Sequence, residues 1–495
     1  MEFIQVYDEG VSQYAYIIGC DKTREAVVID PQRSIEKYLE IAERKNLKIV
    51  AVTETHIHAD FLSGIREFLN RTNVKAYLSD LGKSEGWDYS WVTKNDNVEF
   101  VKDGSKVKFG EITLDVVSTP GHTPDHIVFM VTEGAAPLPL GVVSGDFVFA
   151  GDLGRPDLLE RAAKQDGKMK EGAEALFKTV KKFKNQPDSL MVWPGHGAGS
   201  ACGKSLGNIP YSTWGYEKKT SPALQYNEQK DFIDYITGAQ KEPPLYFARM
   251  KHLNNKGAPL LSTQKEFKSL SAIEMDRLLK AEKDLLVIDA RDNRAEVMAA
   301  HIKGTFYAPF GSLSTATGSM IEDAARPIVL IIDEQRSEEA RTRLINVGYD
   351  NVLGFMTPKS LGIYLEKFGK AERIPVTTFA AINEELQAGA LKVVDVRSGN
   401  EYESAHIEGA IFAPYTRLPE FLGDIPKTGK LYVHCGSGLR ASVAVSYLKS
   451  QGYDVVLVND SFSNSYVAGA TSCGTKPAPA TACSTAPAAT GTCGG

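Results

Sequence analysis

The first half of the chain carries histidine and aspartate side chains in four short motifs, each placed after an apolar run. In chain order, the motifs contain His56 with His58, then His122, Asp146 and His196. Loops that follow strands often carry function, and imidazole and carboxylate groups are common metal ligands. A single buried histidine or aspartate is usually only a hydrogen-bonded polar group. Four such loops that could converge on one rim of a sheet predict a metal site.

A second reactive motif lies further along the chain, where a cysteine follows an apolar run and opens a predicted helix. The loop consists of Cys435, Gly436, Ser437, Gly438, Leu439 and Arg440. Its backbone N–H groups and the positive end of the helix dipole would stabilise a thiolate, the nucleophilic form of cysteine, or a persulfide anion. The glycines let the backbone curl around the sulfur, and Arg440 adds a fixed positive charge. The loop therefore predicts a cysteine that carries transferred sulfur.

The elements that must position these motifs alternate short strands with helical stretches. In the first half, β-rich apolar runs between Gly, Pro and polar residues predict strands at 26–30, 49–53, 112–117 and 127–131. This half ends near Lys251.

The second half contains an internal repeat. Val-Ile-Asp-Ala-Arg at 287–291 matches Val-Val-Asp-Val-Arg at 393–397, and His-Ile-Lys-Gly at 301–304 matches His-Ile-Glu-Gly at 406–409. Each copy then continues into another apolar strand and a helix-like stretch, and reaches Gly-Tyr-Asp. A repeated unit of about 100 residues that alternates strand and helix predicts a small parallel α/β domain.

The four histidine and aspartate motifs, in this order, resemble those of the metallo-β-lactamase superfamily over roughly residues 1 to 250. The resemblance implies an αββα sandwich. Binuclear members read His-x-His-x-Asp-His in the first motif, whereas this chain has Phe61 at the last position. That difference removes one ligand of the second metal and argues against a two-zinc hydrolase of the glyoxalase II type. A one-metal site built from His56, His122 and Asp146 remains.

Two imidazoles and one carboxylate with open positions are typical of non-haem Fe(II) enzymes, because Fe(II) can share electrons with O2 whereas Zn2+ cannot. Within the superfamily, this set resembles that of the persulfide dioxygenases, as does the run 151–159. The resemblance implies one Fe(II) per chain. It makes Arg155 and Asp157 substrate-positioning or ligand-orienting groups, and the alternative is an ion pair that only braces a loop.

Several further side chains accompany the predicted metal site. We expect His58, Asp60 and His196 to hydrogen-bond waters or to orient the ligands. Cys202 follows His196 closely. It either binds or carries sulfur near the metal, or it is a buried structural thiol. Cys20 is expected to be structural.

With the Asp-Val-Arg and His-Ile-Glu-Gly motifs and the cysteine loop, residues 375–465 resemble a rhodanese domain. Related phosphatases have one more residue between cysteine and arginine, so the shorter loop suits a single transferred sulfur atom. In the first copy no cysteine follows the corresponding strand, and Asp333 or Glu334 takes its position, depending on the alignment. Residues 261–370 are therefore predicted to be an inactive rhodanese-like domain that serves as a scaffold or dimer surface.

The order of these parts resembles the bacterial persulfide dioxygenase–rhodanese fusions of sulfide detoxification. The predicted fold class is α/β: a metallo-β-lactamase sandwich at 1–255, the inactive unit at 261–370, the active rhodanese at 375–465 and a disordered tail at 466–495. The resemblance implies that persulfide is oxidised with O2 to sulfite, and that Cys435 passes sulfane sulfur to sulfite to give thiosulfate. Two alternatives stay open: a zinc thioester hydrolase fused to a sulfurtransferase, and a non-oxidative sulfur-relay protein.

Composition argues against other classes of protein. The formal net charge of -6 provides no basic field for nucleic acid. No signal peptide is apparent, and no apolar run approaches the ~18 residues of a spanning helix. The six cysteines are too far apart to resemble a disulfide framework. We expect a cytoplasmic homo-oligomer whose partners are a small-molecule persulfide, O2 and sulfite, with no nucleic acid and no membrane.

The segment after Tyr466 consists mostly of Ala, Thr, Gly, Pro and Ser, yet holds Cys473, Cys483 and Cys493. Because it has almost nothing to bury, it is predicted to be disordered. Truncation after Tyr466 is expected to leave folding and the rate of thiosulfate formation unchanged. A slower rate in the truncated chain would instead indicate that the three thiols shuttle or store sulfane sulfur on a flexible tether.

Overall fold

The computed structural model describes residues 1–161, 167–204, 206–261, 267–369 and 371–467. The predicted tail, with its three cysteines, lies outside the described residues from 468 onward. Within the described ranges, no helix is both long enough and apolar enough to cross a membrane.

The first half folds into two six-stranded sheets that face each other. The first sheet has the order β1 (Glu2–Asp8), β2 (Gln13–Gly19), β3 (Glu25–Ile29), β4 (Lys48–Thr53), β5 (Lys75–Ser79) and β6 (Val98–Val101). The second has the order β12 (Ser212–Thr213), β11 (Met191–Pro194), β10 (Gly141–Gly145), β9 (Ile127–Glu133), β8 (Ile112–Ser118) and β7 (Lys106–Phe109).

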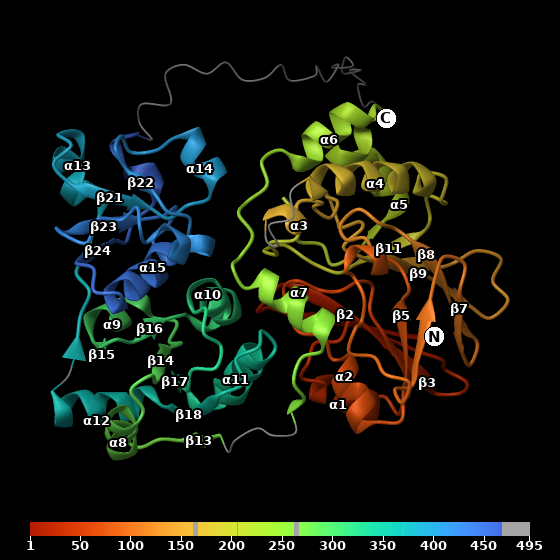
Figure 1. Cartoon of the computed structure of the whole chain (residues 1–495), viewed down its shortest axis with the longest axis horizontal. Helices are drawn as coiled ribbons and strands as arrows, with labels where there is room; N and C mark the ends of the chain where they lie inside the picture. Colours follow the sequence, from red (N-terminus) through yellow and green to blue (C-terminus); the bar gives the residue numbers. More distant parts are fainter. Residues whose placement is uncertain (162–166, 205, 262–266, 370, 468–495) are drawn as a thin grey trace, which may run out of the picture.

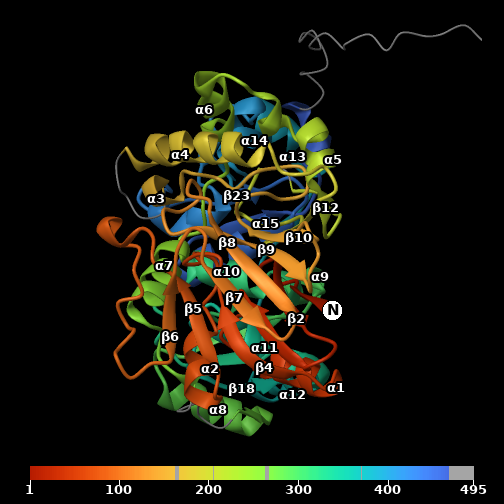
Figure 2. The same cartoon turned by 90° about the vertical axis from the view of Figure 1, so that its right-hand side faces the viewer.

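Helices cover the outer face of each sheet. The first sheet carries α1 (Glu36–Arg44) and α2 (Ile65–Arg71), followed in the chain by the short η1 (Lys83–Glu85). On the second sheet lie α4 (Lys168–Phe183), α5 (Trp214–Thr220) and α6 (Gln229–Thr237), with α3 (Leu158–Arg161) and η2 (Pro222–Gln225) nearby. Figure 2 shows the resulting order of helices, sheet, sheet and helices. The predicted αββα sandwich is thus confirmed.

Continuous runs of apolar residues explain why both faces of each sheet are buried. On β3, Val27 points into the core between the sheets, whereas Val28 packs under α1 and α2. On β9, Phe129 joins the inter-sheet core, and Val128 packs against α4, α5 and α6. Because successive strand residues point to opposite faces, a continuous apolar run produces a sheet that is buried on both sides.

The second half forms two smaller parallel sheets with the same topology. The first has the order β13 (Lys268–Ser269), β18 (Val352–Met356), β17 (Ile328–Ile331), β14 (Leu286–Asp289) and β16 (Phe306–Tyr307). The second has the order β20 (Val376–Thr377), β24 (Val455–Val458), β23 (Leu431–His434), β21 (Lys392–Asp395) and β22 (Ile411–Phe412). A short ladder pairs β15 (His301–Ile302) of the first unit with β19 (Ala371–Glu372), which lies between the two units in the chain.

Helices connect these parallel strands, as right-handed crossovers require. The first unit contains α8 (Ala272–Ala281), α9 (Arg294–Ala299), η4 (Phe310–Ser312), α10 (Leu313–Met320), η5 (Glu334–Arg336), α11 (Ser337–Ile345) and α12 (Pro358–Phe368). The second contains α13 (Phe379–Gln387), α14 (Gly399–Ser404), η6 (Tyr415–Phe421), α15 (Leu439–Ser450) and η7 (Phe462–Asn464). The repeat in the sequence is therefore a repeat of structure.

The sandwich and the two smaller units share one apolar core. It joins Phe61 and Met250 of the first half to Leu344 and Tyr447 of the second. Helix α7 (Phe247–Lys256) lies at this junction (Figure 1). The contact surface also buries polar groups: the guanidinium of Arg33 donates to both carboxylate oxygens of Asp350, at 2.6 and 2.9 Å. A half-buried, bidentate ion pair of this kind helps to fix the orientation of the units.

Candidate metal centre and sulfur-transfer loop

Three buried side chains meet at one edge of the sandwich. His56 follows β4, His122 follows β8 and Asp146 directly follows β10. The distance from Asp146 Oδ2 is 3.3 Å to Nε2 of His122 and 4.0 Å to Nε2 of His56. One donor atom from each residue lies within 4.8 Å of the other two, which is close enough to share one metal ion.

Hydrogen bonds to the other ring nitrogens orient both imidazoles. The Nδ1–H of His122 donates to the backbone carbonyl of Arg155 at 2.9 Å. Nδ1 of His56 lies 3.0 Å from the hydroxyl oxygen of Thr55, which itself donates to the Asp30 carboxylate. In both residues Nε2 is thus left to face Asp146, the arrangement that metal-binding histidines require.

The protonation states of these groups suit a bound cation. Burial lowers the pKa of His122 to about 3 and the pKa of His56 well below its ordinary value, so both rings are neutral ligands. Burial also raises the pKa of Asp146 to about 6. In the described part of the chain, neither carboxylate oxygen of Asp146 has a hydrogen-bond partner. A buried carboxylate without a partner, facing two neutral imidazoles, fits a metal ion as its missing partner.

A second set of donors lies next to the first. Asp60, His196 and Cys202 are buried, and one donor atom from each lies within 4.8 Å of the others. Nε2 of His196 is 3.5 Å from Asp60 Oδ2 and 3.5 Å from Asp146 Oδ1, so Asp146 adjoins both sets. Burial raises the pKa of Asp60 to about 7 and the pKa of Cys202 well above its ordinary value. Cys202 therefore lies beside the predicted metal centre rather than in a distant core.

His58 belongs to neither donor set. Its Nε2 lies 3.2 Å from Asp30 Oδ1, and its ring stacks on Phe61 with 4.3 Å between centroids. Burial opposes protonation of His58, but the Asp30 carboxylate outweighs it and raises the pKa of His58 to about 9. The resulting ion pair holds Asp30, which in turn holds Thr55 behind His56.

Two further residues of this region were missed by sequence reasoning. Nε2 of the buried His126 accepts a hydrogen bond from the backbone N–H of Asp146 at 3.0 Å. Asp125 accepts from the backbone N–H of Ile57 at 2.7 Å, next to the first histidine motif. The one signal in the sequence is that His126 lies four residues after His122 in the same loop, which does not reveal the backbone N–H that it binds.

Arg155 and Asp157 are fully buried. The guanidinium of Arg155 donates twice to the Asp157 carboxylate, both at 2.7 Å, and also to the carbonyls of Ala201 and Lys241 at 3.1 and 2.8 Å. These contacts stabilise the surrounding loops. Arg155 contacts His122 through its backbone carbonyl and not through its guanidinium. A direct role of either side chain in substrate binding stays a prediction.

The cysteine loop lies between β23 and α15 in the second of the smaller units. The backbone N–H of Gly438 donates to Sγ of Cys435 at 3.2 Å. Gly438 has a φ of 85°, and a Cβ there would lie 2.5 Å from the Asn459 side-chain oxygen, so glycine is required. Gly436, Ser437 and Leu439 complete the turn, as the sequence motif predicts.

Arg440 is held beside this loop by a carboxylate that sequence reasoning did not single out. Its guanidinium forms a bidentate pair with Glu401 on α14, at 2.6 and 2.7 Å. Burial opposes ionisation of Glu401, but Arg440 outweighs it and lowers the pKa of Glu401 to about 2. The arginine is thus pre-oriented, and an anion that binds it must share it with Glu401.

Strand register identifies the residue that replaces the cysteine in the first copy. Asp289 at the end of β14 pairs with Ile331 of β17, and Asp395 at the end of β21 pairs with His434 of β23. The next residue in each copy is therefore equivalent, so Ile332 occupies the position of Cys435.

The prediction that Asp333 or Glu334 takes this position is wrong by one or two residues. Both side chains are exposed, at the beginning of the 3-10 turn η5. Ile332 is buried, with 2% of its surface exposed. The end of a central strand is surrounded by apolar side chains, which favours isoleucine over a carboxylate at this position.

The role of Arg440 can be tested directly. Arg440→Ala is expected to slow sulfur transfer to Cys435 about 10- to 100-fold, because a hydrogen bond to a charged group contributes roughly 1.5–3 kcal/mol. The measurement is the second-order rate constant with a sulfane-sulfur donor. Since the variant also leaves Glu401 unpaired, Arg440→Ala combined with Glu401→Gln is the control. Recovery of the wild-type rate in the double variant would mean that Arg440 only neutralises Glu401.

Known protein families match both parts of the chain, the sandwich with the metal-binding residues and the unit with the cysteine loop. The model of the metallo-beta-lactamase superfamily matches residues 8–196, and that of the rhodanese-like domain matches residues 378–466. A solved metallo-beta-lactamase from Staphylococcus aureus is 37% identical to this chain and superposes on it with a TM-score of 0.62. The match covers 72% of this chain and 99% of the Staphylococcus aureus chain. The chain therefore belongs to the metallo-beta-lactamase superfamily and carries a C-terminal rhodanese-like domain.

More distant relatives include proteins with different activities. A mitochondrial persulfide dioxygenase (ETHE1) of Bos taurus is 24% identical over 194 residues, which is 39% of this chain and 66% of that protein. A hydroxyacylglutathione hydrolase of Trichormus variabilis is 24% identical over 271 residues, which is 49% of this chain and 95% of that protein. These relatives support an enzyme with a metal-binding site and a role in sulfur metabolism.

Proposed function

We propose that this protein is a persulfide dioxygenase joined to a sulfurtransferase. The observation that carries the proposal is the donor set at one edge of the sandwich: two neutral imidazoles, His56 and His122, and the Asp146 carboxylate, which has no hydrogen-bond partner in the described residues. Fe(II) held by these residues would supply a centre that shares electrons with O2 and keeps positions open for O2 and substrate. The persulfide dioxygenase relative supports the same assignment.

The proposed overall reaction at this centre consumes one persulfide, one O2 and one water. It yields one thiol, one sulfite and two protons, which balances sulfur, oxygen and charge. Cys202, beside Asp60 and His196, is proposed to line the substrate side of the centre. In the second reaction, the Cys435 thiolate takes the outer sulfur of another persulfide and releases its thiol. Sulfite then removes that sulfur as thiosulfate, and the thiolate is regenerated.

The proposal also covers the first smaller unit, the location of the protein and its oligomeric state. The unit that has Ile332 in place of the cysteine is proposed to be inactive in sulfur transfer, because it offers no thiol at that position. The protein is proposed to be a cytoplasmic homo-oligomer that acts on small molecules. Which thiol carries the persulfide is left to the experiment below.

One observation favours a second candidate function. Asp60, His196 and Cys202 offer three donors next to Asp146, although Phe61 replaces the histidine of the binuclear motif. With two zinc ions bound, the centre would resemble a thioester hydrolase, as the hydroxyacylglutathione hydrolase relatives suggest.

Metal content and O2 uptake distinguish the candidates. The purified protein is assayed for iron and zinc, and O2 consumption is recorded with glutathione, coenzyme A and cysteine persulfides in turn. One iron per chain and persulfide-dependent O2 uptake are expected. Two zinc ions with hydrolysis of a glutathione thioester would favour the hydrolase. Sulfur transfer without any O2 uptake would favour a non-oxidative relay.

A further inference from the structure

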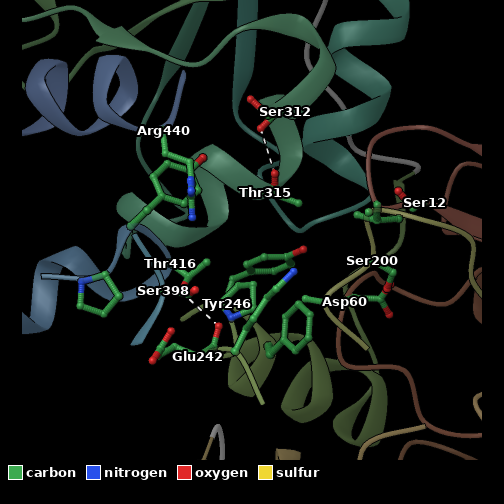
Figure 3. Close-up of a pocket in the computed structure, with 18 of the residues that line it drawn as sticks. Ser12, Asp60, Ser200, Glu242, Tyr246, Ser312, Thr315, Ser398, Thr416 and Arg440 are labelled. Atoms are coloured by element: carbon green, nitrogen blue, oxygen red, sulfur yellow. Dashed lines mark hydrogen bonds between the residues drawn. The ribbon is translucent and has the colours of Figure 1, made fainter. Parts of the chain in front are cut away.

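A chamber of about 750 Å³ lies where the sandwich and both smaller units meet (Figure 3). The sandwich contributes Asp60 and Ser200, the first smaller unit contributes Thr315, and the second contributes Tyr415 and Arg440. Its volume is within the range of about 300–1,000 Å³ that is typical of small-molecule sites. The chamber is therefore large enough for a small thiol carrier together with an anion.

One end of the chamber reaches the metal-binding residues. Asp60 lines the chamber, and its Oδ2 lies 3.5 Å from Nε2 of His196 in the second donor set. Ser200 and Ala201 line the same end and immediately precede Cys202. A product released from the metal centre toward Asp60 would thus enter this space.

The other end reaches the cysteine loop. Arg440 and Tyr415 both line the chamber, and the charge of a Cys435 thiolate acts on both side chains. Arg440 is also the loop's fixed positive charge. An anion that reaches this end would therefore meet the Arg440 guanidinium, which it must share with Glu401. The attraction is local to Arg440, because Glu9, Asp60 and Glu242 also line the chamber.

The wall between these ends is built by a segment that is bonded to both sites. Arg155, whose carbonyl orients His122, donates to the carbonyl of Lys241 at 2.8 Å. The next residue, Glu242, accepts from the backbone N–H of Gly399 at 3.1 Å and, through its carbonyl, from Thr416 at 3.1 Å. Such a bonded wall indicates a built compartment rather than an accidental gap between units.

The opposite wall comes from the first smaller unit. A Cβ on Gly318 of α10 would lie 2.4 Å from the ring of Tyr246, so α10 packs directly on this aromatic side chain. Ser312 and Thr315 from the same region line the chamber and are joined by a hydrogen bond of 3.2 Å. The unit without a cysteine thus contributes part of the space between the two sites.

We propose that this chamber passes sulfite from the metal centre to Cys435 before the anion exchanges with the solvent. The proposal rests on the proposed function and adds a route to it. The hydroxyl groups of Ser12 and Ser200 line the end of the chamber near the metal-binding residues, and Arg440 supplies positive charge at the other end. In the transfer step, the sulfur lone pair of sulfite attacks the outer sulfur of the Cys435 persulfide. The S–S bond breaks, thiosulfate leaves, and the electron pair remains on the Cys435 thiolate.

Isotope dilution tests the route in the full-length, metal-loaded protein. Unlabelled glutathione persulfide and O2 are supplied in the presence of a pool of sulfur-34 sulfite, and the label in thiosulfate is measured by mass spectrometry. Because the persulfide is unlabelled, any sulfur-34 in thiosulfate entered as sulfite from the solvent. We expect the labelled fraction of thiosulfate to be at least about twofold below that of the bulk sulfite, since a confined product has a high effective concentration.

An equal mixture of the Cys435→Ser and His122→Ala variants is the matched control, because sulfite must cross the solvent between chains. Its thiosulfate should carry the full label of the bulk sulfite. Thr315→Trp should fill the chamber and raise the labelled fraction toward that of the mixture, whereas Thr315→Val keeps the size and should not. A wild-type fraction equal to that of the mixture overturns the route but leaves the proposed function standing. If neither unlabelled sulfite nor thiosulfate with an unlabelled sulfite-derived sulfur is formed, the persulfide was not oxidised, and the proposed function is overturned together with the route.

Discussion

His122→Ala is expected to lose bound iron and persulfide-dependent O2 uptake together. The variant removes one of three donors that meet around Asp146, and the remaining two cannot complete the site. Loss of a residue that only orients a ligand typically costs about 10- to 100-fold in metal affinity or activity, so loss of a ligand should cost more than about 100-fold. Iron content by elemental analysis and O2 uptake with an electrode are the two measurements.

His252→Ala is the matched control, because His252 is an exposed histidine on α7 that belongs to neither donor set. This variant should retain its iron and its O2 uptake. The assignment is refuted if His122→Ala loses its iron but still consumes O2 at the normal rate. Full iron content in His122→Ala would show that the metal is held elsewhere, with Asp60, His196 and Cys202 as the next donors to replace.

Residue types and their order were enough to predict the architecture. Apolar runs marked the strands, and the repeated Asp-x-Arg and His-Ile-x-Gly motifs marked two copies of one parallel unit. The loops of His122 and Asp146 lie at one edge of the second sheet because β8 and β10 run in the same direction, each antiparallel to β9. His56 follows β4 of the facing sheet and meets them at the same edge of the sandwich. Local pattern and strand direction together therefore bring the predicted donors to one place.

What the sequence did not reveal depends on contacts between distant segments. Glu401 pairs with Arg440 although 39 positions separate them, and the local Ser398-x-x-Glu401 pattern marks it only as the N3 residue of a helix capping box. His126 supports Asp146 through the backbone, which any residue type would offer equally. The replacement of Cys435 by Ile332 required the pairing of β14 with β17, since an alignment by residue type alone prefers a polar residue. Packing between elements determines all three.

The chamber also depends on contacts between distant segments of the chain. Its lining comes from the sandwich and from both smaller units, so no single motif encodes it. The proposed metal ligands and the sulfur-transfer loop lie in separate domains, and neither chemistry requires a group from the other. The structure retains the separate donor sets but brings Asp60 and Arg440 to one shared space (Figure 3). The two chemical steps can be independent even if the product of the first reaches the second through a shared space. Cys435→Ser tests whether the first step proceeds without the second.

Cys435→Ser is expected to consume O2 when given persulfide but to release sulfite instead of thiosulfate. Serine keeps the shape of the loop, yet its hydroxyl is hardly ionised at neutral pH and is a poor nucleophile toward sulfur. The metal-binding residues lie in the sandwich, and none of them belongs to the rhodanese-like unit. O2 uptake should therefore continue, while enzymatic thiosulfate falls to the level of the spontaneous reaction between sulfite and excess persulfide. Both sulfur products are measured by chromatography in the same reaction.

A matched control is available in the other copy of the repeat. Asp333→Asn combined with Glu334→Gln alters exposed residues at the equivalent turn and should change neither product, because that copy has no thiol to carry sulfur. Normal enzymatic formation of thiosulfate by Cys435→Ser, after the spontaneous rate is subtracted, would show that another group carries the sulfur. If Cys435→Ser instead abolishes O2 uptake, Cys435 must deliver the persulfide to the metal centre. The chamber would then conduct substrate from Arg440 toward Asp60, the reverse of the direction proposed for sulfite.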